Sequence, residues 1–388
     1  MIHPKLIPIF HQPFVAMSPA VLITKVEIYK SRIVLKEPFK ISLGILTHAE
    51  NVIVKLTTDA GITGFGECSP FLTINGESMD TCFIVAQYLG KTLINKNALD
   101  IAGCTVVMEK VIYANNSIKS AFDMALHDIA AHHAGQPLYE FLGGTNSKTL
   151  ITDYTVSIDD PAKMASDAAR IKANGFQVIK VKLGQRIDLD LERMRRIREA
   201  VGMEIPIRID ANQGWDPQSA LTLLNNLAPL NIQHCEEPIP RWNFMALPEL
   251  KKKSPIRLMA DESCCDQHDA RRLIDLDACD LFNVKLGKSG GIFNAMQIAE
   301  IAENHNISIQ VGGFLESRLA FTAAAHFALA SDNIIYCDFD TPLMFVDDPV
   351  SGGIEYDRQG VISVPEIAGL GASFSEDYLQ DLESVSVY

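Results

Sequence analysis

Apolar and polar residues alternate from Val21 to Pro70 with the period of two that is typical of β-strands. Asp59, Ala60 and Gly61 interrupt the alternation and supply a hairpin turn. From residue 78 to about residue 144 the apolar residues instead lie three and four apart, which predicts helices. A small antiparallel sheet followed by helices predicts an α+β domain.

The pattern changes again after Gly144, where short runs rich in β-branched residues alternate with amphipathic helical stretches. We expect eight strands, at residues 151–158, 177–184, 205–212, 232–238, 256–263, 281–287, 307–314 and 334–340. Strands that alternate with helices form parallel β/α units, and eight such units are the number that closes a barrel. The predicted fold class is therefore α/β, a (β/α)8-type, TIM-like barrel with an N-terminal α+β capping domain.

The same pattern divides the chain into a leader, a capping domain and a barrel. We expect a poorly ordered leader at 1–20, the capping domain at 21–144 and the barrel, with the catalytic residues, at 145–351. The tail at 352–388 has turn residues but no further β/α unit, so we expect it to fold back and complete the capping domain. Because prolines interrupt the leader, we expect no signal peptide, and either Met1 or Met17 can be the start.

Charge and cysteine usage narrow the class of partner. The chain has 34 Lys and Arg against 48 Asp and Glu, a net charge of −14, which is the wrong sign for binding a phosphate backbone or an anionic membrane. Its eight cysteines form no CxxC pair and suit free thiols in a reducing compartment. We predict a cytoplasmic protein that binds a small molecule, not nucleic acid or a membrane, and the sequence leaves a homo-oligomer open.

Residues that carry chemistry recur at the predicted strand ends, where the active site of such a barrel lies. They are spaced 24 to 28 residues apart, at Lys182, Asp210, Glu236, Asp261 and Lys285. Because each interval is about one β/α unit, we expect these side chains at similar heights on neighbouring strands.

Three consecutive strands each contribute one carboxylate, from Asp210, Glu236 and Asp261. No His or Cys stands in register beside them, and Cys235 alternates to the other face of its strand. Such an oxygen-rich set suits a hard divalent ion, Mg²⁺ with Mn²⁺ able to substitute. The alternative is that these residues are solvated acids, but converging carboxylates without a cation repel one another.

Lys180 and Lys182 lie two residues apart and therefore share the face of their strand that points into the barrel. A neighbouring ammonium group disfavours the charged form of a lysine, so we expect a lowered pKa that suits a general base. The second and sixth strands are opposite in an eight-stranded barrel, so Lys182 and Lys285 should face each other across the pocket. That arrangement suits removal of a proton from one face of a carbon and its return to the other. The alternative is that the lysines only pair with the carboxylates.

The ordered motifs resemble those of the enolase superfamily, in its muconate-lactonizing-enzyme subgroup. They are KVK, DANQGW, EEP, ADES and VKLGKSGGI, which begin at residues 180, 210, 236, 260 and 284. The resemblance covers nearly the whole chain and implies that Asp210, Glu236 and Asp261 bind Mg²⁺ while Lys182 and Lys285 form the acid/base pair. This chain has EEP where relatives usually have EQP, and we expect Glu237 to alternate away from the metal.

Within that subgroup, CDFDTP at 337–342 resembles the DxD feature of dipeptide epimerases. Asp338 and Asp340 share one face and offer two anions, which suits the cationic end of a substrate. The substrates of an o-succinylbenzoate synthase or a muconate cycloisomerase bring only carboxylates, so this pair argues against those activities.

The resemblance implies an isomerase, a Mg²⁺-dependent dipeptide epimerase that inverts the α-carbon of the C-terminal residue. Two lysines would transfer the proton through an enediolate that Lys180 helps to stabilise. We expect Lys180, Thr155, Asp338 and Asp340 to bind the substrate and Asn212 to support the metal ligands. The alternatives are an N-acylamino-acid racemase or an o-succinylbenzoate synthase, and, outside the enzymes, a metal-binding scaffold barrel.

The dipeptide itself is less constrained. An L-Ala-D/L-Glu substrate, in murein peptide metabolism, is the first candidate, but Gly44 stands where relatives acting on Ala-Glu place an arginine. A hydrophobic or broad specificity is the alternative. The motif GFGECS at 64–69 lacks the third glycine of a dinucleotide-binding fingerprint, so we assign no cofactor to it.

Overall fold

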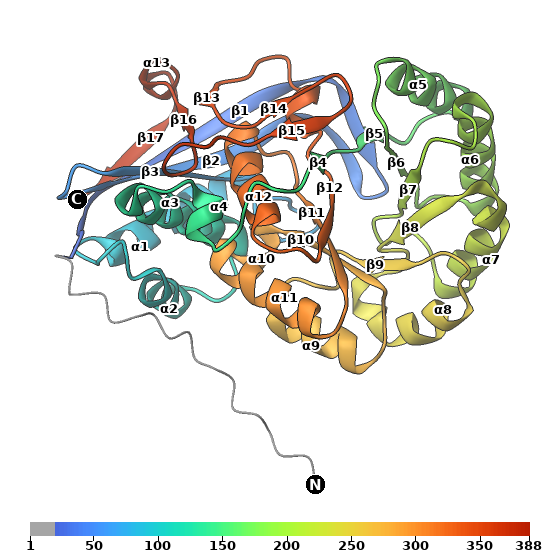
Figure 1. Cartoon of the computed structure of the whole chain (residues 1–388), viewed down its shortest axis with the longest axis horizontal. Coiled ribbons are helices and arrows are strands. Elements are labelled where there is room, and N and C mark those ends of the chain that lie inside the picture. Colours follow the sequence, from blue (N-terminus) through green and yellow to red (C-terminus); the bar gives the residue numbers. More distant parts are fainter. Residues whose placement is uncertain (1–19) are drawn as a thin grey trace, which may run out of the picture.

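The computed structural model describes residues 20–388 and places an antiparallel sheet beside a barrel of parallel strands (Figure 1). The antiparallel sheet has the order β17-β1-β2-β3, with bounds Ser384–Val387, Ile23–Ile41, Gly44–Thr58 and Thr63–Cys68. The expected hairpin turn joins β2 to β3, where Gly61 has a φ of 74°. All but the last residue of the predicted leader, and the choice between Met1 and Met17, lie outside the described residues.

Helices α1 (Met79–Leu93) and α3 (Asn116–Ala134) pack against this sheet, α2 (Ile101–Val111) packs against both of these helices, and the short α4 (Leu138–Phe141) follows. Helix α3 crosses β3 so closely that a Cβ atom on Gly66 would lie 1.8 Å from the Ala121 carbonyl oxygen. The glycines of the GFGECS motif therefore allow a strand and a helix to touch. Within residues 20–388, no helix combines the length and apolarity needed to cross a membrane.

Eight parallel strands, β5 to β12, lie side by side in chain order. They span Tyr154–Val156, Ile179–Lys182, Ile207–Asp210, Ile232–Glu236, Leu258–Ala260, Leu281–Lys285, Ser308–Gly312 and Ile334–Cys337. A bridge between Thr152 and Cys337 joins the two ends of this sheet. The predicted TIM-like barrel with an N-terminal capping domain is confirmed.

The surrounding helices, α5 to α12, span Pro161–Ala173, Ile187–Val201, Pro217–Leu227, Leu247–Lys253, Gln267–Asp275, Leu286–Ser289, Ile292–Asn304 and Arg318–Leu329. Two of them begin with the same signal, because Asp160 and Asp216 cap the free N–H groups of helices whose first residue is proline. Short 3₁₀ turns lie at Ala228–Leu230, Arg241–Ala246 and Thr341–Met344.

The first barrel strand is shorter than the predicted 151–158. Leu150–Ile151 forms a separate strand, β4, because it pairs with β15 (Val361–Ser363), which also pairs with β14 (Glu355–Tyr356). Further along the tail, β13 (Val350–Gly352) pairs with β16 (Ala372–Phe374), α13 spans Glu376–Gln380, and β17 returns to pair with β1. The domain boundaries themselves stay a prediction.

Candidate active site

The carboxyl ends of neighbouring barrel strands bring the expected lysines and carboxylates into register. Lys182 on β6 pairs with Asp210 on β7, and Asp210 pairs with Glu236 on β8. Asp261 follows β9, and Lys285 ends β10, four strands from β6. All five side chains are buried.

Ammonium and carboxylate groups alternate in this cluster. The Nζ atom of Lys182 lies 2.6 Å from Asp210, and that of Lys285 lies 2.7 Å from Asp261. Burial by itself would raise the pKa of both aspartates, but the neighbouring ammonium groups outweigh it and hold each pKa well below its usual value. For Glu236, burial and the Asp210 charge outweigh the neighbouring ammonium groups and raise the pKa of the carboxyl group to about 7.

The expected lowering of a lysine pKa by a second ammonium group is not found. Lys180 is buried, which by itself lowers its pKa, yet the carboxylates of Asp338, Glu236 and Asp210 raise it well above the usual value. The pKa of Lys285 is likewise raised, because Asp261 and Glu236 outweigh burial. The carboxylates of other strands therefore determine the direction of both shifts.

The chemistry of this cluster fits a hard divalent cation. Asp210, Glu236 and Asp261 are each 0% exposed and offer only oxygen atoms. Among the described residues, the buried Oδ1 of Asn212 and Oε2 of Glu262 have no hydrogen-bond partner, so oxygen atoms remain free beside the three carboxylates. Oxygen donors without nitrogen or sulfur are the ligands that Mg²⁺ prefers.

Two predicted neighbours of the cluster stabilise its backbone. The backbone N–H of Asn212 donates to Oδ1 of Asp210 at 2.8 Å, and its side-chain amide donates to Glu262 at 3.4 Å. Glu237 has a positive φ of 34°, and its Oε2 accepts the backbone N–H of Asp261 at 2.7 Å.

Reasoning from the sequence missed two side chains that hold the carboxylates in place. The Nζ atom of Lys288 lies 2.6 Å from Oδ1 of Asp261 and donates to the Asn283 carbonyl at 3.0 Å. The side-chain amide of Asn283 donates to Glu236 at 2.8 Å. The spacing of Lys285 and Lys288, three residues apart across the strand end and α10, was the available signal.

A second group of acids lies at the end of β12. Asp153, Asp338 and Asp340 each place one oxygen within 4.8 Å of the others, and this group is distinct from the three carboxylates described above. The backbone N–H of Thr155 donates to Asp340 at 2.6 Å, so Thr155 contacts this group through its main chain. Burial and the Asp338 charge raise the pKa of Asp340 to about 7.

Asp153, the third acid, was also missed. It is 0% exposed, and its Oδ2 lies 2.7 Å from an Arg208 guanidinium nitrogen. Lys180 adds a second cation, 2.7 Å from Asp338. The three carboxylates of this group therefore lie beside two cations, and Lys180 is shared with Glu236 of the first group.

A cavity between the barrel and the capping domain is lined by the two lysines of the first group and by two acids of the second. Six apolar side chains line it: Phe39, Ile41, Phe71, Ile74, Phe314 and Leu315. The predicted site residues in its lining are Thr155, Lys182, Asn212, Lys285, Asp338 and Asp340. Gly44 instead borders a neighbouring hollow, next to Ile45 and Leu72.

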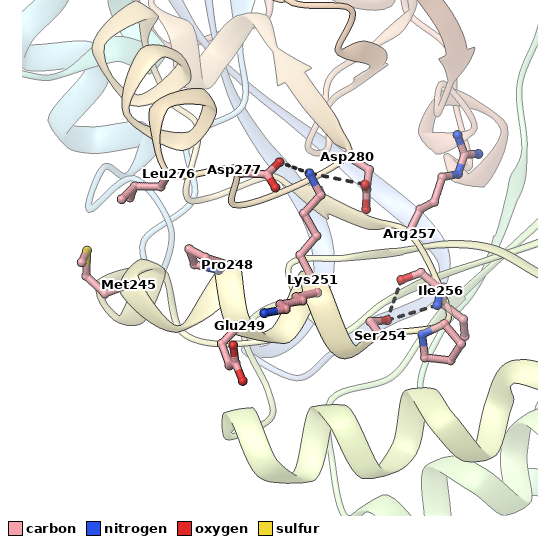
Figure 2. Close-up of a pocket in the computed structure, with 12 residues that line it drawn as sticks. Met245, Pro248, Glu249, Lys251, Ser254, Ile256, Arg257, Leu276, Asp277 and Asp280 are labelled. Carbon is pink, nitrogen blue, oxygen red and sulfur yellow. Dashed lines mark hydrogen bonds and ion pairs between the residues drawn. The ribbon is translucent and has the colours of Figure 1, made fainter.

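Figure 2 shows a different pocket, on the outside of the barrel between α8 and the end of α9. Lys251 forms an ion pair with Asp277 there at 2.5 Å, and Met245 and Leu276 lie at its border. None of the predicted site residues lines this pocket, so it carries no part of the predicted chemistry.

Comparison with known families assigns both parts of the chain. Residues 23–143 match the mandelate racemase / muconate lactonizing enzyme N-terminal domain, and residues 163–378 match the enolase C-terminal domain-like family. The chain belongs to the enolase superfamily. The superfamily resemblance expected from the sequence motifs is confirmed.

Among superfamily members, the chain is 60% identical to the D-Ala-D/L-Ala epimerase of Cytophaga hutchinsonii, over 94% of this chain and 100% of that protein. A crystal structure of the dipeptide epimerase from C. hutchinsonii, complexed with Mg and the dipeptide D-Ala-L-Val, matches with a TM-score of 0.94 over 95% of this chain and 100% of that one. The N-succinyl Arg/Lys racemase of Bacillus cereus matches at 35% identity and a TM-score of 0.92, over 95% of this chain and 100% of that one.

Proposed function

We propose that this protein is a Mg²⁺-dependent dipeptide epimerase that inverts the α-carbon of the C-terminal residue. One observation carries the proposal. A single cavity is lined by Lys182 and Lys285, which come from opposite strands and pair with Asp210 and Asp261, and by the two acids Asp338 and Asp340. These features match the two charged ends of a dipeptide and the carbon between them.

Asp210, Glu236 and Asp261 would hold the Mg²⁺ ion. When bound, the ion would attract the substrate carboxylate and stabilise the negative charge that develops on it. Lys180 supports the same end of the substrate, because its Nζ atom lies 2.8 Å from Glu236 and is fully buried. A buried ammonium group stabilises developing negative charge more strongly than one in water.

Lys182 and Lys285 would move the proton. They lie on strands that are opposite in the barrel, so the α-carbon of a dipeptide held between them presents one face to each lysine. One lysine removes the α-proton as an amine, and the opposite lysine returns a proton as an ammonium group. The configuration of the carbon is thereby inverted.

Asp338 and Asp340 would bind the free α-ammonium group of the substrate. Thr155 keeps Asp340 in place through its backbone N–H. Charge-assisted hydrogen bonds of this kind are about twice as strong as neutral ones. We therefore propose that a free N-terminus is part of what the enzyme recognises.

We propose small apolar side chains for the substrate. Phe39, Phe71 and Phe314 line the cavity. Gly44 stands where an arginine was expected to bind a glutamate side chain, and a glycine has no side chain that could do so. A C. hutchinsonii relative acts on D-Ala-D/L-Ala, which supports this class. L-Ala-D/L-Glu remains the second dipeptide candidate, supported by a Clostridium acetobutylicum L-Ala-D/L-Glu epimerase that is 36% identical over 87% of this chain and 94% of that protein.

We propose the cytoplasm as the place of action, which suits eight free cysteines.

An N-succinyl amino acid racemase is the second candidate activity, because the B. cereus racemase has closely similar structure. An N-succinyl substrate would place a carboxylate where Asp338 and Asp340 lie, and like charges repel at that distance. This repulsion favours the dipeptide.

The test is deuterium incorporation at the α-carbon. The purified enzyme with Mg²⁺ is incubated in D₂O with D-Ala-L-Ala, L-Ala-L-Ala, L-Ala-L-Glu and N-succinyl-L-Lys, and each substrate is analysed by mass spectrometry and chiral chromatography. We expect exchange and epimerisation with the Ala-Ala dipeptides. A preference for N-succinyl-lysine over every dipeptide would replace the proposal with the racemase, and the absence of any exchange would favour a scaffold.

A further inference from the structure

Glu67, in the GFGECS motif, connects the capping sheet to the barrel. It lies on β3 and is 0% exposed. Its carboxylate accepts the hydroxyl of Ser317 at 2.6 Å and the backbone N–H groups of Ser317 at 3.1 Å and Ala320 at 3.4 Å. Ser317 is the residue before α12. Glu67, which belongs to the capping sheet, therefore accepts hydrogen bonds from the N-terminus of a barrel helix.

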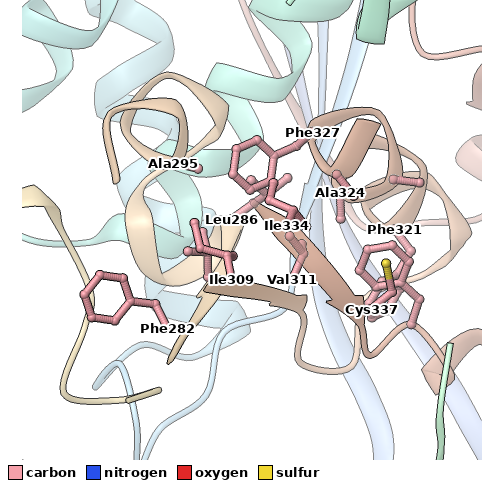
Figure 3. Close-up of a cluster of buried hydrophobic side chains, with 14 of the residues drawn as sticks. Phe282, Leu286, Ala295, Ile309, Val311, Phe321, Ala324, Phe327, Ile334 and Cys337 are labelled. Carbon is pink, nitrogen blue, oxygen red and sulfur yellow. The ribbon is translucent and has the colours of Figure 1, made fainter. Parts of the chain in front are cut away.

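Helix α12 is itself firmly packed on the barrel. Figure 3 shows Phe321, Ala324 and Phe327 of this helix among the buried side chains of β11 and β12, such as Val311 and Ile334. The start of α12 is therefore fixed relative to the strands, and Glu67 ties β3 to a rigid point.

The same network holds the loop between β11 and α12. The side-chain amide of Asn51 donates to Glu67 at 2.7 Å and to the Leu315 carbonyl at 3.0 Å. The N–H of Leu315 donates to Ser69 at 3.2 Å. Both backbone groups of Leu315 are thus bound by side chains of the capping domain, from Asn51 on β2 and from Ser69 just after β3.

This loop carries the aromatic ring that covers Lys285. The Phe314 ring centroid lies 4.9 Å from the Lys285 Nζ atom and 5.9 Å from the ring of Phe71. Lys182 is covered by a different ring, that of Phe39 on β1, at 5.9 Å. The polar contacts of Glu67 and Asn51 lead to the loop that carries Phe314 and thus to Lys285, whereas Phe39 meets Leu315 only through an apolar cluster.

We propose that Glu67 is a positioning residue that, through Asn51 and Leu315, holds Phe314 against Lys285 and so orients one of the two proton-transferring lysines. The proposal rests on the proposed two-lysine epimerase. Replacing the Glu67 carboxylate would loosen the loop and slow proton transfer at Lys285, and it would leave transfer at Lys182 nearly unchanged. A purely structural role would slow both transfers alike.

Asp123 on α3 offers a matched control. It is also buried and also caps a barrel helix from the capping side, because it accepts the backbone N–H groups of Ile292 and Phe293 at the start of α11. Its contacts do not reach the cavity lining. Asp123→Asn should therefore reproduce any general loss of stability without the specific effect on Lys285.

The experiment measures α-proton exchange through each lysine separately. Lys182→Ala leaves only Lys285 to exchange the α-proton with D₂O, and Lys285→Ala leaves only Lys182. Glu67→Gln is combined with each. We expect it to slow exchange through Lys285 by roughly tenfold and exchange through Lys182 by less than about twofold. Asp123→Asn should change both by less than about twofold.

Asn51→Ala is the second variant, for use if Glu67→Gln fails to fold, because it releases Leu315 and leaves the cap on α12 intact. It should show the same asymmetry. Equal slowing at both lysines, in either variant, would overturn the role of Glu67. Exchange of no dipeptide by the wild-type enzyme would refute the proposed function instead, so the two failures are distinguishable.

Discussion

Lys180 and Asp338 form a buried ion pair, in which the Nζ atom lies 2.7 Å from Oδ2. The same ammonium group lies 2.8 Å from Glu236, so it joins the three proposed metal ligands to the acids at the end of β12. The proposed binding sites for the two charged ends of a dipeptide are therefore held at a fixed separation by one side chain. A substrate that lacks its carboxylate or its ammonium group would leave the corresponding binding site without a charged partner.

The first prediction concerns the metal. Treatment with EDTA should abolish epimerisation, and added Mg²⁺ or Mn²⁺ should restore it, because converging carboxylates need a cation. Asp210→Asn should lower kcat by at least about a hundredfold, since it removes one charged ligand and the partner of Lys182. Turnover that survives chelation, or full activity of Asp210→Asn, would contradict the metal assignment.

The second prediction concerns the two lysines. Lys182→Ala and Lys285→Ala should each abolish epimerisation, because each removes proton transfer on one face of the α-carbon. Each single variant should still exchange the α-proton of one epimer with D₂O, through the remaining lysine. Chiral chromatography and mass spectrometry measure the two processes. Normal epimerisation by either variant would refute a two-base mechanism.

The third prediction concerns the ammonium subsite. Removing one partner of a desolvated charged hydrogen bond costs roughly 2–5 kcal/mol, so Asp338→Asn or Asp340→Asn should lower kcat/KM for a free dipeptide at least about tenfold. N-succinyl amino acids serve as the control, because the wild-type aspartates repel their added carboxylate. An equal loss on both substrates would show that these aspartates act only on the fold.

The fourth prediction concerns pH. Burial and the Asp338 charge raise the pKa of Asp340 to about 7, so the free enzyme loses this anion as the pH falls through that value. Affinity for the substrate ammonium group should fall with it, and kcat/KM for a free dipeptide should decrease on the acidic side of about pH 7.

Asp340→Asn is the control for the pH profile, because asparagine does not titrate. The decrease near pH 7 should be absent from this variant. Glu236, whose pKa burial also raises to about 7, is the competing group. A profile that is unchanged in Asp340→Asn would assign the titration to Glu236 or another group.

The sequence predicted the barrel and the positions of its lysines and carboxylates, because parallel β/α units repeat at a nearly constant length. One chemistry-bearing residue per repeat is sufficient to place Lys182, Asp210 and Glu236 side by side. The prediction weakened where the repeat is irregular. The first strand was placed too early, because residues 150–151 leave the barrel to pair with β15, a contact between distant segments.

The side chains that support the site were not predicted. Glu67 and Asn51 lie in a hairpin, and their contacts with Ser317 and Leu315 depend on how the capping sheet docks on the barrel. No local pattern encodes that docking. The pKa of Lys180 was misjudged for a similar reason, since its value depends on carboxylates of other strands.

Strand β17 pairs with β1 at the edge of the capping sheet, with Val387 opposite Val26. A ribosome synthesises every barrel strand after β1 and before β17. The edge of β1 therefore has no partner while the barrel emerges, and an unpaired edge strand can pair with other chains. Nascent chains released before residue 384 should aggregate more readily than chains that include β17, although they contain all the proposed catalytic residues.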